Sequence, residues 1–284
     1  MKEKTKKKWL YYLIGMALLI YFLYYQNNSL VTSEYTITSN NLPKSFHNYK
    51  IVQLSDLHSK LFGEDQEDLL KRVNRTEPDL IVFTGDLIDS NRSDEQTGIL
   101  LMEKLIEIAP VFYVTGNHEW WSGKFNELEE DLESIGVQVM RNTSEYITIG
   151  EDKIQIIGLD DPAIEGSSHA EKAKTEENIK EAITGFEGED HFRILLSHRP
   201  ELFSLYSDYG FELVFSGHAH GGQFRIPFVG GLIAPDQGLF PEFTSGEHHS
   251  EGTTMIVNRG LGNSIVPFRI FNHPEIVVVT LRSA

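Results

Sequence analysis

After about residue 50, the chain repeats one arrangement of hydrophobic and polar positions. A short apolar run rich in Val, Ile, Leu and aromatic residues is followed by a polar or glycine-bearing turn, and then by apolar residues at helical spacing. Continuous apolar runs predict strands that are buried on both faces. They occupy residues 51–54, 80–83, 111–114, 154–159, 194–196 and 213–215, and helices are predicted at 65–73, 96–108, 124–135 and 171–183. The alternation predicts an α/β domain, with a strand-rich final part at 253–281.

The N-terminal end has a different pattern, because residues 9–25 contain no charged side chain. As a helix rising about 1.5 Å per residue, this segment nearly crosses the hydrocarbon core of a bilayer. Aromatic residues gather at both its ends and a lysine-rich segment precedes it, which predicts a cytoplasmic N-terminus and an extracytoplasmic domain. A cleaved signal peptide has a similar pattern, but no small-x-small cleavage motif follows. We therefore favour an uncleaved single-pass membrane anchor.

Four segments are expected in the chain. Residues 1–8 form a basic cytoplasmic tail, 9–25 the membrane anchor, 26–48 a linker with an edge strand, and 49–284 one folded domain. A hydrophobic content of 40% in 284 residues is sufficient for one large core. Cysteine is absent, which excludes disulfides, thiolate metal sites and thiol nucleophiles. The net charge is −17, and so strong an acidic excess makes nucleic acid an improbable partner, since like charges repel.

Five of the apolar runs end in residues that are able to bind metal. Such residues converge in space because ligands bind beyond the carboxyl ends of strands in α/β sheets. Carboxylates, imidazoles and an amide oxygen, without sulfur, suit divalent Mn, Fe, Zn or Co. Seven candidate ligands are too many for one ion and sufficient for two. The candidates are Asp56 and His58 after the first run, Asp86 after the second, Asn117 after the third, His198 after the fifth, and His218 and His220 after the sixth.

These residues and their neighbours resemble a known signature. The motifs are Asp56-x-His58, Gly85-Asp86, Gly116-Asn117-His118-Glu119, His198 and Gly217-His218-x-His220. In order and spacing they resemble the calcineurin-like metallophosphoesterases, over about residues 51–220. The phrases at 217–227 and 258–262 resemble the membrane-anchored bacterial branch of that superfamily. The resemblance implies a four-layer α/β/β/α sandwich after an N-terminal transmembrane helix.

The resemblance also implies a role for each motif residue. Asp86 would bridge two divalent ions, with one ion completed by Asp56, His58 and His220. The other ion would be completed by Asn117, His198 and His218. His118 would bind the phosphate and protonate the leaving oxygen, so it is the catalytic candidate.

The activity implied is metal-dependent hydrolysis of a phosphodiester or lipid-linked phosphate at the membrane surface, by attack of a metal-bridging hydroxide. Two alternatives stay open. One is hydrolysis of a pyrophosphate bond in a nucleotide-lipid precursor. The other is a metal-binding scaffold without catalysis.

Several neighbouring features have both a functional and a structural interpretation. Trp120 and Trp121 could stack on a substrate or only pack, and Arg225 and Arg259 could bind phosphate or form salt bridges. The apolar segment 224–235 is either a lip for acyl chains or the bilayer, or a hairpin covering the core. Asp89 could orient an imidazole, but a carboxylate at a helix N-terminus is favoured. No role is assigned to His47, His169, His191, His248, His249 and His273.

Overall fold

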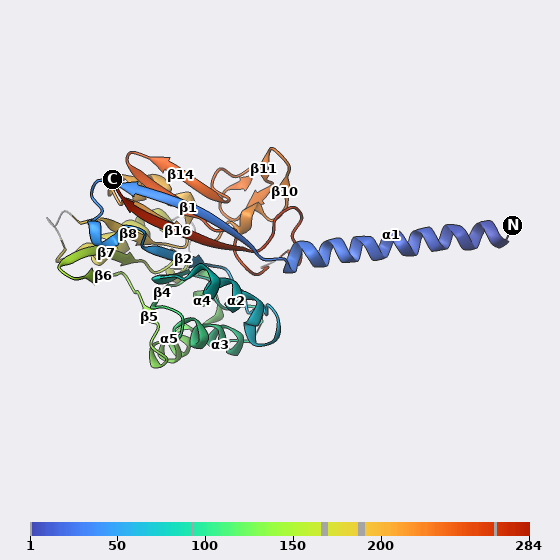
Figure 1. Ribbon diagram of the computed structural model, residues 1–284, viewed down its shortest axis with the longest axis horizontal. Helices are drawn as coiled ribbons and strands as arrows, with labels where there is room; N and C mark the ends of the chain where they lie inside the picture. Colours follow the sequence, from blue (N-terminus) through green and yellow to red (C-terminus); the bar gives the residue numbers. More distant parts are fainter. Residues whose placement is uncertain (1, 93, 166–169, 187–190, 264–265) are drawn as a thin grey trace.

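Two six-stranded sheets form the centre of the computed structural model, which describes residues 2–92, 94–165, 170–186, 191–263 and 266–284 (Figure 1). In spatial order the first sheet contains β1 (Val31–Ser39), β16 (Glu275–Ser283), β2 (Lys50–Leu54), β3 (Leu80–Thr84), β4 (Val111–Val114) and β5 (Gln138–Val139). The second contains β14 (Gly246–Ser250), β15 (Thr253–Val257), β9 (Leu213–Ser216), β8 (Arg193–Leu196), β7 (Asp152–Gly158) and β6 (Thr143–Ile149).

Most neighbouring strands near the middle of each sheet are parallel. In the first sheet β2, β3, β4 and β5 run parallel, and β16 pairs antiparallel with β2. In the second sheet β15, β9, β8 and β7 run parallel, and β14 and β6 are antiparallel edges. The carboxyl ends of the parallel strands therefore lie together at one edge of each sheet.

Helices cover the outer face of each sheet, which makes four layers. Helices α2 (Glu67–Thr76), α3 (Gln96–Leu105) and α5 (Phe125–Ser134) pack on the first sheet, and α6 (Glu171–Ile183) and α7 (Phe203–Asp208) pack on the second. A separate core between the sheets includes Ile51 and Phe215. In β2, Ile51 faces this core whereas Val52 and Leu54 face the helices. The α/β/β/α sandwich is thus confirmed, and double coverage explains the continuous apolar runs.

The predicted elements exist, with ends that differ by a few residues. The predicted strand at 111–114 and the predicted helix at 171–183 have the bounds of β4 and α6. Strands β5, β6 and β14 and the helices α4 (Asn117–Ser122) and α7 were not predicted; a six-residue helix such as α4 is too short to show a period. The other short elements are β10 (Arg225–Ile226), β11 (Gly230–Gly231), β12 (Ile233–Ala234), β13 (Gly238–Leu239), η1 (Lys44–Phe46), η2 (Glu64–Gln66), η3 (Pro162–Glu165), η5 (Pro200–Leu202) and η6 (His220–Gly222).

Helix α1 (Lys2–Asn28) projects away from the sandwich (Figure 1). Among the described residues it is the one helix long and apolar enough to cross a membrane, judged by length and composition. The helix extends beyond the apolar segment 9–25, and β1 begins soon after it at Val31. Within segment 26–48, Leu30, Leu42 and Phe46 are buried in the domain. The division of the chain into tail, anchor, linker and domain stays a prediction.

The inter-sheet core should dominate the stability of the domain. Phe215 is fully buried there, so Phe215→Ala should lower the free energy of unfolding by about 3–5 kcal/mol through lost transfer energy and the cavity left behind. The matched control Phe228→Ala removes a fully exposed ring and should change it by at most about 0.5 kcal/mol. Urea unfolding of the detergent-solubilised chain measures both. Equal effects of the two substitutions would contradict this account of the core.

Candidate metal centre

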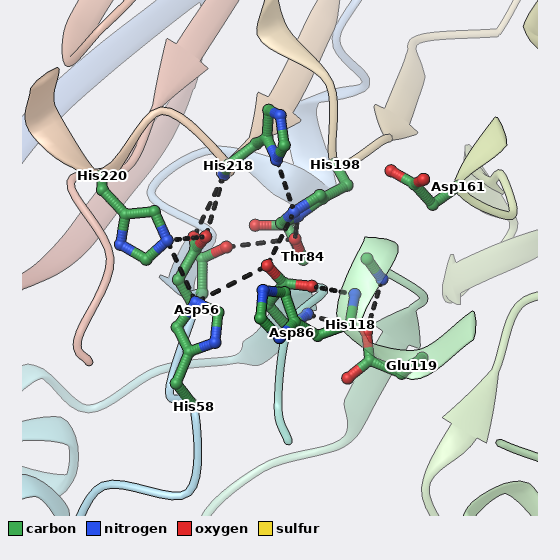
Figure 2. Close-up of polar contacts among 12 residues, drawn as sticks. Asp56, His58, Thr84, Asp86, His118, Glu119, Asp161, His198, His218 and His220 are labelled. Atoms are coloured by element: carbon green, nitrogen blue, oxygen red, sulfur yellow. Dashed lines mark hydrogen bonds and ion pairs between the residues drawn. The ribbon is translucent and has the colours of Figure 1, made fainter. Parts of the chain in front are cut away.

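Loops from both sheets carry the site, which lies at the carboxyl ends of the parallel strands. Strands β2, β3 and β4 lead into the first four candidate ligands, and β8 and β9 lead into the other three. Figure 2 shows the side chains of the candidate carboxylates and imidazoles turned toward one another. Each of the seven candidates is buried, with at most 3% of its surface exposed: Asp56, His58, Asp86, Asn117, His198, His218 and His220.

A first group contains Asp56, His58, Asp86 and His220, each of which offers one atom within 4.8 Å of the others. The Nε2 atoms of His58 and His220 are 3.0 Å apart. The Nε2 atom of His220 lies 3.3 Å from Oδ1 of Asp56, and that of His58 lies 3.6 Å from Oδ2 of Asp86. Two carboxylates and two imidazole nitrogens therefore surround one point.

A second group shares Asp86 with the first. It contains Asp86, His198 and His218 within the same 4.8 Å limit. The Nε2 atom of His198 lies 3.3 Å from Oδ2 of Asp86 and 3.2 Å from Nδ1 of His218. Asn117 lines the same cavity of about 110 Å³ as Asp86 and His218. The two groups therefore meet at the carboxylate of Asp86.

The donors fit divalent ions. The Oδ1 atom of Asn117 is buried and has no hydrogen-bond partner among the described residues, although a buried amide oxygen normally has one. Two imidazole nitrogens at 3.0 Å need a proton or a cation between them. Oxygen and nitrogen donors without sulfur are those that Mn, Fe, Zn or Co accept. The residues present thus fit a site for divalent metal.

The protonation state of the imidazoles also favours the binding of a metal ion. Burial lowers the pKa of His58 to about 3 and, together with Arg199, that of His218 to about 4. Burial also lowers the pKa of His220 well below its ordinary value, with His58 adding to the effect. These three rings are therefore neutral near pH 7, as a metal ligand must be.

His198 and Asp86 depend strongly on each other's charge. Burial alone would raise the pKa of Asp86, but His198 and His118 outweigh burial and hold that pKa well below its ordinary value. For His198, burial acts to lower the pKa, and Asp86 overcomes burial and raises it to about 10. The pair therefore favours positive charge between Nε2 of His198 and Oδ2 of Asp86, a preference that a bound cation satisfies.

Hydrogen bonds behind the rings select their tautomers. Nδ1 of His198 lies 2.6 Å from the carbonyl oxygen of Thr84, so Nδ1 carries a hydrogen and Nε2, turned toward Asp86, is the atom that holds either a proton or a cation. Nε2 of His218 lies 3.2 Å from Oδ2 of Asp236, so its Nδ1 lone pair faces His198. These contacts aim the other nitrogen of each ring at the point that Asp86, His198 and His218 surround.

Glu119 holds the Asp86 loop in place. Its Oε2 accepts hydrogen bonds from the backbone N–H groups of Asp86 at 2.9 Å and Gly116 at 2.6 Å. Its Oε1 accepts from Leu87 at 2.9 Å and Ile88 at 3.3 Å. One buried carboxylate thus binds the loops after β3 and β4 together. Glu119 belongs to the motif at 116–119, but its place in the sequence indicated no role for it.

Several candidate ligands have left-handed backbone conformations. Their φ angles are 52° at Asp56, 48° at His58, 55° at Asp86, 63° at His218 and 46° at His220. An L-residue pays about 1–2 kcal/mol for this conformation, so the surrounding contacts must hold it. The spacing of two would place Asp56 and His58 on the same side of an extended strand end, but the backbone at both positions is not extended. Both side chains reach the site from tight turns instead.

His118 stands at the wall of the cavity, outside both groups. Its Nδ1 accepts a hydrogen bond from the backbone N–H of Ser90 at 3.0 Å, so its Nε2 carries the hydrogen of the neutral ring. The ring lies 4.5 Å from that of His58 and lines the cavity with Asp86 and Trp121. His118 is therefore placed as a donor beside the candidate ligands.

The two tryptophans, the two arginines and the apolar segment, each of which had two interpretations, have the following surroundings. Trp121 lines the cavity, whereas Trp120 packs on Phe125 with ring centroids 4.8 Å apart. Arg259 forms a salt bridge to Glu275 at 2.7 Å. Arg225 donates to the carbonyl oxygen of Gly221 at 2.9 Å, and segment 224–235 forms short antiparallel ribbons. Both arginines thus have structural partners.

Asp89 and the described histidines without an assigned role lie outside the two groups of candidate ligands. Asp89 lies in a loop 3.8 Å from Nδ1 of His118, and the next helix begins at Gln96, so the favoured helix N-terminal position was wrong. Among the described residues, none of the unassigned histidines joins the two groups or lines the cavity; these are His47, His191, His248, His249 and His273. His169 lies outside the described residues.

Two buried arginines near the site escaped the sequence analysis. Arg199 contacts Asp161 through Nε at 2.7 Å and NH2 at 3.1 Å, and Asp236 through NH1 at 2.7 Å. Because Asp236 also contacts His218, Arg199 fixes the carboxylate that orients this imidazole. Arg269 lies 3.4 Å from Nδ1 of His220 and donates to the carbonyl oxygen of Gly262. Of the two arginines, only Arg199 could have been noticed in the sequence, because it directly follows the candidate ligand His198.

Comparison with known proteins agrees with this geometry. The model of the calcineurin-like phosphoesterase family matches residues 49–222, which is more than half of the chain. The chain is 34% identical over 268 residues to the uncharacterized metallophosphoesterase YkuE of Bacillus subtilis, covering 93% of this chain and 89% of the relative. The chain therefore belongs to the calcineurin-like phosphoesterases, and it is a metallophosphoesterase that hydrolyses phosphoric esters.

Two further similarities are to a transmembrane protein and to a solved structure. A transmembrane protein with a metallophosphoesterase domain from Bos taurus is 30% identical over 255 residues, covering 86% of this chain and 55% of that protein. The solved structure of a putative 5'-nucleotidase from Staphylococcus aureus aligns with a TM-score of 0.51 at 13% identity, covering 82% of this chain and 54% of that one. This structural likeness shows the fold alone.

The close approach of Gly217 to the site generates a prediction. A Cβ atom at Gly217 would lie 2.0 Å from Oγ of Ser55 and 2.5 Å from Oδ2 of Asp56. Gly217→Ala should therefore displace Asp56 and weaken Mn²⁺ binding by about 10–100-fold, the usual effect of losing ligand support. Gly15→Ala is the control, because nothing lies within 4 Å of its added Cβ. Calorimetric titration with Mn²⁺ measures both; wild-type affinity in Gly217→Ala would contradict the packing argument.

Proposed function

We propose that this chain is a membrane-anchored phosphoesterase that uses two divalent ions to hydrolyse a phosphodiester or a lipid-linked phosphate at the membrane surface. The observation that carries the proposal is the meeting of two groups of ligand atoms at Asp86. One carboxylate flanked by imidazoles on both sides is suited to holding two cations close together. The ions are of the Mn, Fe, Zn or Co class.

Each candidate residue has a place in this centre. Asp86 would bridge the ions, and Asp56, His58 and His220 would complete the first site. His198 and His218 would hold the second ion together with Asn117, whose unpaired Oδ1 needs a partner. When bound, the ions would lower the pKa of coordinated water and neutralise charge on the phosphoryl oxygens.

His118 would handle the leaving group. Its Nδ1 accepts from the backbone N–H of Ser90, so Nε2 carries the hydrogen that the ring would donate to a phosphate oxygen or to the departing alkoxide. Trp121 lines the same cavity and would limit the access of water to this proton. The chain's own part in the reaction is thus to position the phosphate, to hold one proton at His118 and to fix the ligand rings.

Helix α1 supports action at a membrane. Its apolar side chains from Trp9 to Tyr25 are largely exposed, and the relative from Bos taurus is named a transmembrane protein. Lysines precede the apolar segment, which favours a cytoplasmic N-terminus and a catalytic domain on the opposite side of the membrane. Tethering of this kind raises the local concentration of membrane-bound substrates.

The alternatives differ in what the site must contain. Hydrolysis of a pyrophosphate bond in a nucleotide-lipid precursor would use the same ions and His118. A scaffold without catalysis would need neither the placement of His118 in the cavity wall nor a donor set for two ions. Family membership and the geometry of His118 favour the enzyme.

The proposed roles separate metal binding from proton donation. His118→Ala should lower kcat by about 10²–10⁴-fold on a diester with an alkoxide leaving group, such as a glycerophosphodiester, because general acid catalysis is lost, and by less on bis(p-nitrophenyl) phosphate, whose phenolate leaves without a proton. Metal content, measured by mass spectrometry, should stay at the wild-type level. His249→Ala, at an exposed position on β14, is the control and should keep full activity. A parallel fall in metal content and activity in His118→Ala would make His118 a ligand.

Metal stoichiometry tests the sharing of Asp86. Asp86→Ala should remove both ions, since both groups lose a donor and a negative charge, whereas His58→Ala should leave about one ion per chain. Chelation should abolish wild-type activity, and added Mn²⁺ should restore it. Equal metal loss in the two variants would argue against a bridging carboxylate.

A further inference from the structure

Apolar side chains outside α1 are exposed mainly in one region of the described chain. Phe228 is fully exposed, and Val229, Leu239 and Phe240 each expose more than 60% of their surface. Phe268 exposes 39% and Phe271 53%. We call these six residues the apolar patch. A water-soluble surface rarely exposes so many large apolar side chains together, so the patch needs an occupant.

Backbone hydrogen bonds join the segments of the patch into one surface. The N–H of Arg225 donates to the carbonyl oxygen of Ile270 at 3.0 Å, and β10 pairs with β11. The N–H of Leu232 donates to Phe224 at 2.8 Å, and that of Phe240 donates to Leu232 at 2.9 Å. The six residues therefore belong to adjacent strands and turns.

The charged side chains of this segment are engaged within the protein. Between residues 222 and 240 the charged residues are Arg225 and Asp236. Arg225 donates to Gly221 at 2.9 Å and to Thr244 at 3.3 Å. Asp236 pairs with Arg199 at 2.7 Å. The exposed tips of the segment are consequently uncharged.

The patch continues onto the end of the anchor helix. The rings of Phe22 and Phe271 lie edge to face with centroids 5.8 Å apart. Oδ1 of Asn27, in the last turn of α1, accepts hydrogen bonds from the N–H of Arg269 and from Nδ2 of Asn263, each at 3.0 Å. Figure 1 shows β10 and β11 on the side of the sandwich from which α1 projects. The anchor thus holds the patch near its own end.

The same segment forms part of the cavity wall. Gln223, Pro235 and Asp236 line the cavity together with the candidate ligands. Asn272 donates from Nδ2 to the carbonyl oxygens of His220 at 2.8 Å and Gln223 at 3.0 Å, which joins the patch to the site. Any surface that receives the patch therefore lies next to the cavity.

We propose that the apolar patch inserts into the interface of the bilayer that holds α1, and that it sets the cavity over the headgroups, so that the substrate is the phosphoester of a membrane lipid. The part of this proposal that concerns the cavity and its lipid substrate rests on the proposed function. Aromatic and aliphatic tips without charge prefer this interface, and α1 already brings the bilayer to the edge of the patch. Continuity with the anchor makes the bilayer, and not a protein partner, the occupant.

A single labelled cysteine tests the insertion, since the chain has none of its own. Phe228→Cys carries an environment-sensitive fluorophore, and the full chain is reconstituted into vesicles of phosphatidylethanolamine and phosphatidylglycerol. Its emission should shift to the blue, and nitroxide lipids should quench it. The matched control is Ile149→Cys, an exposed apolar position at the end of β6, a strand on the side of the sandwich away from α1 (Figure 1). Equal quenching at both positions, or none at Phe228→Cys, would overturn the insertion.

Activity on two substrates tests the consequence for catalysis. The double variant Phe228→Ser, Phe240→Ser should cleave vesicle phospholipid roughly tenfold more slowly than wild type, because the loss of apolar contact weakens insertion. Activity on soluble bis(p-nitrophenyl) phosphate and the melting temperature should be unchanged. Equal loss on both substrates, or no loss on phospholipid, would overturn the proposal, as would a wild-type enzyme active on the soluble ester alone. Failure of Mn²⁺-loaded wild type on both substrates would instead reject the proposed function, while quenching would still report insertion.

Discussion

The whole site depends on one buried carboxylate that is shared by two sets of imidazoles. Asp86 lies 3.6 Å from Nε2 of His58 on one side and 3.3 Å from Nε2 of His198 on the other. A charge buried to this degree is stable only when a positive group and hydrogen bonds satisfy it, here His198 and the backbone N–H of His118. Glu119 fixes the loop that carries it through three backbone N–H groups and joins it to the loop after β4 through the N–H of Gly116. Two buried acids therefore serve different purposes, one facing the ligands and one holding the backbone.

The sandwich gives this carboxylate its neighbours by joining the ends of two sheets. Below the site, Nε2 of Gln53 in β2 donates to Oγ1 of Thr84 and to the carbonyl oxygen of Ser216, both at 2.9 Å. Asn258 reaches across to the carbonyl oxygen of Gln53 at 3.1 Å. These buried contacts fix β9 relative to β2 and β3, and with them the histidines relative to the aspartates. The fold thus positions groups that no single sheet would bring together.

Helix α1 is joined by direct contacts to the same architecture. Asn27 contacts the backbone of Arg269, and the guanidinium of Arg269 lies beside His220. A chain of direct contacts therefore runs from the last turn of α1 to a candidate ligand. An active site attached in this way has a fixed orientation relative to the helix, whereas a site on a flexible tether would sample many orientations. Under the proposed function, this constraint links the nearby apolar patch to the choice of a membrane substrate.

The sequence by itself determined the buried strands, the long helices and the identity of the seven candidate ligands, because periodicity and residue chemistry are local properties. The tertiary structure decided how those ligands meet. Asp56 and His58 approach each other through left-handed turns and not along an extended strand, since contacts from distant loops hold that backbone. Arg199 and Arg269 became visible only in the fold, because their partners Asp161, Asp236 and His220 are separated from them in sequence. The position of the apolar patch beside α1 likewise arises from the pairing of segments far apart along the chain.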